Sequence, residues 1–147
     1  MKFMVMVRAT PQTETETNPA GDDPEARADL VREMMSYNEA LTQAGVMLGG
    51  EGLLPSSKGA RVVFAGDGRT VVDGPFAESK ELIAGYWMWQ CASLQEAIDW
   101  AKRCPNPTGH DSVLEIRQVV EAEDFGPELA PEIREREAQM RAAVDGR

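Results

Sequence analysis

Two stretches decide the fold of this chain: KFMVMVRA at residues 2–9 and LIAGYWMWQ at residues 82–90. Side chains alternate between the two faces of a β-strand, so Phe3 and Val5 lie on one face and Met4 on the other. Because both faces are apolar, each stretch is typical of an inner strand whose sheet is covered on both sides. We therefore expect a sheet with two inner strands and an apolar layer on each face.

Two amphipathic helices are predicted between the strands. The first begins at Asp23, whose carboxylate can cap backbone N–H groups, and ends at Gly45, which can adopt the left-handed conformation. The second begins with a capping box formed by Ser93 and Glu96 and ends before Pro105. The apolar stripe of the first helix follows the helical repeat through Leu30, Met34, Tyr37 or Asn38, and Leu41.

Turn residues mark the remaining strands. Residues 46–54 form a strand with two adjacent glycines, which indicate a bulge or a close approach of backbones. Residues 61–65 and 70–72 form a hairpin around the Gly-Asp-Gly turn at 66–68. We expect these three strands to make a meander, and residues 113–120 to form the last strand.

The order of these elements predicts an α+β fold: a ferredoxin-like βαββαβ antiparallel sheet with an inserted hairpin strand. Both helices then cover one face of the sheet, and the other apolar face needs a second layer. A second copy of the chain is the simplest cover, so we expect a homodimer. One domain is expected over residues 1–121 and a helical tail over residues 122–147, while the polar residues 10–22 should form an exposed loop.

Composition argues against several classes of protein. The chain has 147 residues and a formal net charge of −10, with no basic cluster, which disfavours direct binding of nucleic acid. No apolar run approaches the roughly 20 residues that span a bilayer, so we expect no membrane contact and a cytoplasmic location. Cys91 and Cys104 lack a metal-ligand spacing and are interpreted as reduced packing residues. With a single histidine besides, no metal site is expected.

A motif follows the predicted hairpin: DGPFAESKE at residues 73–81, and then Gly-Tyr-Trp at 85–87. It resembles the signature of the DGPF-motif branch of the YCII-related family. Supporting similarities lie at Gly-Gly-Glu-Gly-Leu 49–53, at Trp-Ala-Lys-Arg-Cys-Pro 100–105 and at Glu-Ile-Arg 115–117. Together they span most of residues 1–120.

This resemblance implies a dimeric α+β barrel of ferredoxin-like protomers, with a cleft bounded by the motif loop and the inner sheet face. Most members of the family are uncharacterised; related proteins include a dehydrochlorinase, and genes of this branch often accompany extracytoplasmic-function sigma factors. The better-studied YCII branch is associated with a His-Asp pair in its cleft, whereas the only histidine here, His110, does not align with that pair. Fold kinship does not fix the function.

Three residues are candidates for proton transfer. His110 has the type of side chain best suited to proton transfer near neutral pH, and Asp111 is a possible orienting partner. Asp73 and Glu51 are carboxylates that can face the cleft. Structural alternatives stay open, because His110 belongs to a loop and Asp73 can accept hydrogen bonds from turn amides.

Five residues are candidates for ligand binding. Glu115 and Arg117 share the strand face that should meet the partner sheet, where a buried charge needs a pair or a ligand. Arg117 can hold a carboxylate through two hydrogen bonds. Trp87 can form an aromatic wall, and the family pattern adds Glu78 and Lys80. The alternatives are a Glu115–Arg117 ion pair or an exposed edge-strand pair, core packing of Trp87, and solvated charges at Glu78 and Lys80.

These residues lead to two functional hypotheses, and a purely structural dimer without a cleft ligand is the third alternative. The chain contains no GxGxxG, P-loop or nucleophile-elbow motif, so no cofactor is expected. The first hypothesis is a cofactor-independent isomerase or lyase that transfers a proton on a small anionic organic molecule. The second is a non-catalytic ligand-binding or regulatory module that acts through a partner protein, favoured by the acidic tail and its narrow apolar stripe.

Overall fold

The computed structural model describes residues 1–15, 23–108 and 110–147. Its main elements follow in the order β1 (Lys2–Arg8), α1 (Pro24–Gln43), β2 (Met47–Gly52), β3 (Ala60–Ala65), β4 (Gly68–Asp73), β5 (Ile83–Gln90), α2 (Leu94–Lys102), β6 (Leu114–Gln118) and α3 (Ala130–Asp145). Short 3₁₀-helices lie between them at η1 (Ser56–Lys58), η2 (Ser79–Glu81) and η3 (Ala122–Phe125). This is the predicted βαββαβ order, with the β3–β4 hairpin inserted before β5.

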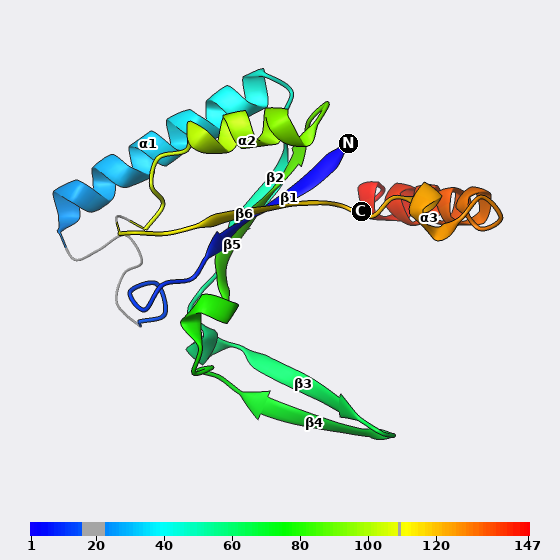
Figure 1. The fold of residues 1–147 in the computed structure, drawn as a ribbon, viewed down its shortest axis with the longest axis horizontal. Helices are drawn as coiled ribbons and strands as arrows, with labels where there is room; N and C mark the ends of the chain where they lie inside the picture. The colour runs from blue at the N-terminus through cyan, green and yellow to red at the C-terminus, as the bar shows by residue number, and fades with distance from the viewer. Residues whose placement is uncertain (16–22, 109) are drawn as a thin grey trace.

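The main sheet has four antiparallel strands in the order β2-β5-β1-β6, which is the ferredoxin-like arrangement. The two apolar stretches, β1 and β5, are therefore the inner strands, as predicted. Their register pairs Phe3 with Trp89 and Val5 with Trp87, so large apolar side chains from neighbouring strands meet on one face. Helices α1 and α2 lie on the same side of this sheet (Figure 1).

The core lies between the sheet and these two helices. Phe3, Val5, Leu41 and Trp89 are fully buried there. Burying one large apolar side chain stabilises a fold by about 1.5–3 kcal/mol. This cluster therefore holds α1 and α2 on the sheet.

The opposite face of the sheet has an apolar centre, and neither α1 nor α2 covers it (Figure 1). Alternation places Met4 and Met6 of β1 on this open face, together with Tyr86 and Met88 of β5, and all four are half-buried. The open face therefore keeps the apolar character on which the expectation of a second layer rests.

The hairpin does not join the main sheet. Within the described residues, β3 and β4 form a separate two-stranded sheet, so the predicted meander with β2 is wrong. After β2 the chain turns through η1, and β3 begins away from the sheet edge. All residues of both strands are exposed, and the hairpin projects away from the body (Figure 1).

Both helices begin close to the predicted residues. The Asp23 carboxylate accepts a hydrogen bond from a first-turn backbone N–H at 3.0 Å, and Gly45, just past α1, has a φ of 73°. The Ser93 hydroxyl accepts from the Glu96 N–H at 3.1 Å. The Glu96 carboxylate accepts from the N–H of Ala92 at 2.6 Å, one residue before the Ser93 N–H that a capping box uses.

The loop after β1 is partly buried. Thr10 and Thr13 are each 8% exposed, and each hydroxyl accepts a hydrogen bond from the backbone N–H of the other residue, at 3.2 and 2.8 Å. The expected exposed loop is therefore wrong for these two residues, because their hydrogen bonds satisfy the polar groups locally. Residues 16–22 of that expectation lie outside the described residues.

Both cysteines are free thiols that pack as predicted. Cys91 is 3% exposed within the core cluster, and Cys104 packs against the same cluster. Burial raises the pKa of the Cys104 thiol to about 11, so this side chain is protonated near neutral pH.

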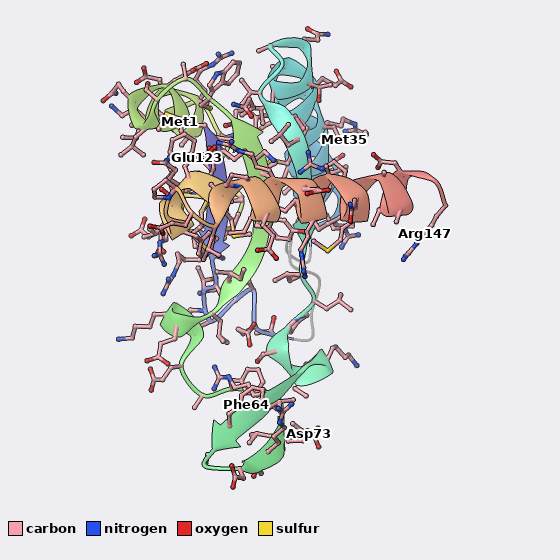
Figure 2. The ribbon with its side chains drawn as sticks, turned by 90° about the vertical axis from the view of Figure 1, so that its right-hand side faces the viewer. Met1, Met35, Phe64, Asp73, Glu123 and Arg147 are labelled. Carbon is pink, nitrogen blue, oxygen red and sulfur yellow. The ribbon has the colours of Figure 1, made fainter. Side chains whose placement is uncertain are left out.

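The C-terminal segment forms η3 and α3, which an ion pair between Arg134 and Glu123 ties together. Figure 2 shows α3 lying across the side of the molecule that faces the viewer. Met140 and Val144 on this helix are exposed, at 61% and 58%. In the parts of the chain that the structure describes, no helix has the length and apolar character needed to cross a membrane.

Candidate functional site

A pocket of about 460 Å³ lies between α1 and the helix-covered face of the sheet. Its α1 side is lined by Leu30, Val31, Met34 and Asn38. Its sheet side includes Val7, Gly50, Gly85 and Trp87, and loop residues Thr13, Pro107 and Thr108 complete it. Small-molecule sites typically have volumes of about 300–1,000 Å³ and mostly apolar walls with a few polar groups, and this pocket has both properties.

Glycines allow the sheet to form one wall of this pocket. A Cβ at Gly50 would lie 2.9 Å from Trp87 Cδ1 and 2.9 Å from the Tyr86 carbonyl oxygen, and a Cβ at Gly85 would lie 3.0 Å from the Glu51 carbonyl oxygen. Strands β2 and β5 can approach this closely only without side chains at those positions. The register between them also shifts in the segment Met47–Gly49. The predicted bulge and close approach are therefore both confirmed.

Trp87 lines the pocket and, at 7% exposed, also belongs to the core cluster, as its packing alternative states. Its position is fixed from two sides. Its indole Nε1–H donates a hydrogen bond to Asn38 Oδ1 at 2.9 Å. Its ring meets the ring of Tyr37 edge-on, with centroids 6.1 Å apart and an interplanar angle of 82°. The Tyr37 hydroxyl in turn donates to the Trp100 carbonyl oxygen at 2.7 Å, which ties α1 to α2. Burial raises the pKa of Tyr37 far above its ordinary value, so the phenol stays a neutral donor.

Glu51 is the charged residue of the pocket. Among its described lining residues, no other side chain is acidic or basic at neutral pH. Glu51 lies on the edge strand β2 and is the cross-strand neighbour of Tyr86, so both side chains alternate toward the open face and these two residues border the pocket at the edge of the sheet. Glu51 is exposed. The pocket thus has an uncharged wall with one acidic residue at its exposed border.

Four other predicted site residues do not line this pocket. Asp73 ends β4 on the projecting hairpin, and Figure 2 shows it far from Met35 of α1. Glu78 and Lys80 are exposed residues at η2, and the Lys80 carbonyl oxygen accepts a hydrogen bond from the Arg8 guanidinium. His110 is exposed in the loop before β6, as its sequence context indicated.

Glu115 and Arg117 lie together on the open face of the sheet, as their alternation in β6 predicts. They are the cross-strand partners of Met6 and Met4. The Glu115 carboxylate forms its ion pair with Arg8, with 3.1 Å between Oε1 and Nη1, and not with Arg117. In the described part of the chain Arg117 has no ion-pair partner, and its side chain is exposed.

The DGPF motif builds the base of the hairpin. The Gly74 N–H donates to the Gly59 carbonyl oxygen at 2.9 Å, and the Phe76 N–H donates to Ser56 Oγ at 3.0 Å. Ser56 also donates from its backbone N–H, at 3.2 Å, and from its hydroxyl to the Glu14 carboxylate. The motif residues therefore connect η1, the hairpin and the loop after β1.

An arginine completes this connection. The Arg61 guanidinium lies over the Phe76 ring, 3.8 Å from its centroid, and such a cation–π contact adds about 0.5–1 kcal/mol at an exposed site. The motif thus has a structural role at some distance from the α1 wall of the pocket.

Sequence reasoning missed the polar groups of the pocket. Asn38 gave one usable signal, because a polar residue at a position of the buried stripe of a helix needs a partner, here Trp87. Thr13 and Thr108 lie in loops without periodicity and gave no such signal.

Within the described residues, no group of three or more His, Cys, Asp and Glu side chains is placed to hold a metal ion.

The fold and the pocket together define a class of protein: a ferredoxin-like α+β protein with a pocket of small-molecule size between its first helix and its sheet. The YCII-related domain matches residues 1–123 of the chain. The chain therefore belongs to the YCII-related family.

Two similar proteins accompany this match. An uncharacterized protein of Rhizobium meliloti (strain 1021) is 31% identical over 90 residues, which cover 61% of this chain and 73% of that protein. Among solved structures, 5-chloro-2-hydroxyhydroquinone dehydrochlorinase from Burkholderia phenoliruptrix AC1100, in complex with 2,5-dihydroxybenzoquinone, is similar with a TM-score of 0.46 and 14% identity. That similarity covers 82% of this chain and 95% of the other.

Proposed function

We propose that this protein, a member of the DGPF branch of its family, binds a small organic molecule in the pocket under α1 and moves a proton on it without a cofactor. The observation that carries the proposal is the pocket, with its apolar and aromatic wall and the exposed residue Glu51 at its β2 border. A ligand held against the apolar wall would present its reacting carbon at this border, within reach of the Glu51 carboxylate. The combination supports an isomerase or lyase that acts by proton transfer.

Glu51 is the base in this proposal. It removes a proton from a carbon next to a carbonyl group; the proton then returns to another carbon in an isomerisation, or a leaving group departs in an elimination. Glu51 ranks before Asp73 and His110 because it lines the pocket and they do not. Positioned acid–base groups of this kind typically accelerate reactions by about 10²–10⁴-fold.

The pocket favours a ligand with an apolar body. Apart from Glu51, its described lining residues are uncharged, and a carboxylate beside Glu51 would be repelled. A small organic acid fits this arrangement when its carboxylate stays at the mouth of the pocket, in water, and its apolar part lies against Trp87. The expected organic acid thus remains the proposed ligand class.

We further propose that the protein is cytoplasmic and forms a homodimer in which a second copy covers the open face of the sheet. The half-buried Met4, Met6, Tyr86 and Met88 support this arrangement. Arg117 lies on the same face and would pair with a group of the second copy or of a ligand, since a charge at an interface needs a partner.

The alternative function is a ligand-binding or regulatory module without catalysis. One observation favours it: a groove of about 700 Å³ between the exit of β6 and α3, with Val120, Met140 and Val144 in its wall. All three side chains are exposed in this chain, which suits contact with a partner protein. In this alternative the pocket senses a ligand and the C-terminal helix transmits the signal.

A deuterium-exchange experiment separates the two functions. Small organic acids that raise the melting temperature of the protein are incubated with it in D₂O, and incorporation of deuterium at carbon is followed by NMR. We expect exchange with the wild type, a loss of at least about 100-fold in Glu51→Gln with binding retained, and no change in Glu33→Gln, an exposed carboxylate on α1.

Two outcomes contradict parts of the proposal. Unchanged exchange in Glu51→Gln removes Glu51 as the base. Compounds that bind and never exchange favour the non-catalytic module.

A further inference from the structure

The orientation of the Asn38 side-chain amide follows from the chemistry of its neighbour. The Trp87 indole N–H can only donate a hydrogen bond, so the atom of Asn38 that lies 2.9 Å from it is the acceptor Oδ1. This contact fixes the other half of the amide as well, because Nδ2 must point away from the indole. Trp87 is 7% exposed and held by Tyr37, so the amide has a rigid support.

The Nδ2 group is available to a ligand. Within the described residues, no group accepts a hydrogen bond from it. Two side-chain atoms of the described residues are fully buried without a hydrogen-bond partner, Ser57 Oγ and Trp89 Nε1. Asn38 Nδ2 is not one of them, so this group is not sealed inside the protein. Asn38 is half-buried and lines both this pocket and a second, more open hollow beside Met35, Glu39 and Thr42, so its two free N–H groups are open to a ligand.

We propose that Asn38 determines the specificity of this pocket by donating a hydrogen bond from Nδ2 to a carbonyl oxygen of the ligand. The preferred ligand is a compound with an apolar, aromatic body beside Trp87 and a carbonyl oxygen directed toward α1. One oriented polar contact on an apolar wall is the usual means by which such a pocket selects a ligand. This inference rests on the proposed function, because it requires the pocket to be the binding site.

The two roles of Asn38 can be separated by substitution. Asn38→Asp keeps an acceptor oxygen for the Trp87 indole and replaces the Nδ2 donor by a second acceptor.

A second pair of variants tests the pocket itself. Val31→Trp fills the pocket from α1, at a position that is 48% exposed. Met35→Trp is its control, because it places the same side chain one turn away, at a position that is 57% exposed and does not line the pocket.

The probes are acetophenone and ethylbenzene, which have nearly the same size and differ in one carbonyl oxygen. Their binding to the ¹⁵N-labelled full chain is measured by chemical-shift titration, which also reports the Trp87 indole N–H. We expect the wild type to prefer acetophenone by about three- to tenfold, as for one net hydrogen bond. We expect Asn38→Asp to lose this preference, to bind ethylbenzene within about twofold of the wild type, and to keep the Trp87 signal in place.

Each remaining outcome decides a different point. The role of Asn38 is refuted if both probes bind the wild type equally or if Asn38→Asp keeps the preference for acetophenone. The pocket itself still stands in that case when Val31→Trp abolishes binding and Met35→Trp does not. If neither probe binds, or Val31→Trp binds both normally, the pocket is not the binding site and the proposed function fails together with this inference.

Discussion

At the scale of single residues, Gly74 occupies a position where only a hydrogen atom fits. A Cβ there would lie 1.7 Å from the Ser56 carbonyl oxygen, so the backbone or η1 would have to move. Overpacking of this kind costs roughly 1–3 kcal/mol. We expect Gly74→Ala to lower the free energy of unfolding by about that amount, as measured by urea denaturation.

Gly59 supplies the matched control. It lies across the same hydrogen bond from Gly74, has an extended φ of −119°, and a Cβ there would lie 3.6 Å from the Ser56 carbonyl oxygen, an ordinary contact. Gly59→Ala should therefore leave the stability nearly unchanged. Equal stability of the two variants would show that the close approach to Ser56 is not the reason for glycine in the motif.

The candidate site was predictable only in part, also for reasons at this scale. Glu51 and Trp87 could be selected because glycines and an apolar run mark their strands. Asn38 and the loop threonines could not, because their role depends on which helix face meets which strand. Arg117 and Glu115 were correctly placed on one face, but the partner of Glu115 is Arg8, which lies 107 residues away in sequence.

At the scale of elements, the sequence predicted the strands and helices of the main sheet well, because their signals are local. Alternation identifies β1 and β5, and the caps at Asp23 and Ser93 locate the two helices. The hairpin turn was also predicted, since Gly66 has a φ of 58°. The pairing of the hairpin was not, because strand composition does not say whether a hairpin joins the sheet or stands apart from it.

The isolated hairpin leads to a prediction about elements. The Gly74 N–H and the Gly59 carbonyl oxygen are joined by a 2.9 Å hydrogen bond, so a two-residue Asn-Gly turn can replace residues 60–73 without opening the base. We expect this shortened chain to fold with a melting temperature within a few degrees of the wild type, by circular dichroism. Failure to fold would mean that β3 and β4 support the main sheet.

At the scale of the whole molecule, one chain leaves the apolar centre of its open sheet face without a covering layer. Stable protein interfaces bury about 600–1,000 Å² on each partner, and their centres are rich in apolar and aromatic side chains. Met4, Met6, Tyr86 and Met88 form such a centre, with Arg8, Glu115 and Arg117 beside it. The dimer proposal therefore concerns this face.

A charge at the centre of this face tests the dimer. We expect the wild type to be dimeric at micromolar concentration by light scattering, and Met6→Glu to be a folded monomer, because a buried carboxylate without a partner is unfavourable. Met35→Glu, which places the same charge on the exposed side of α1, should stay dimeric. A monomeric wild type, or a Met6→Glu variant that remains dimeric, contradicts the proposed interface.

The central claim is that the pocket between α1 and the sheet binds a small organic molecule, and a comparative thermal-shift screen tests it most directly. The wild type, Val31→Trp and Met35→Trp are each heated with the same library of small organic acids and neutral aromatic compounds. A ligand at 100 times its dissociation constant stabilises the folded state by about 2.7 kcal/mol, which is readily detected. We predict compounds that stabilise the wild type and Met35→Trp but not Val31→Trp; stabilisation that persists in Val31→Trp, or none in any protein, would contradict the claim.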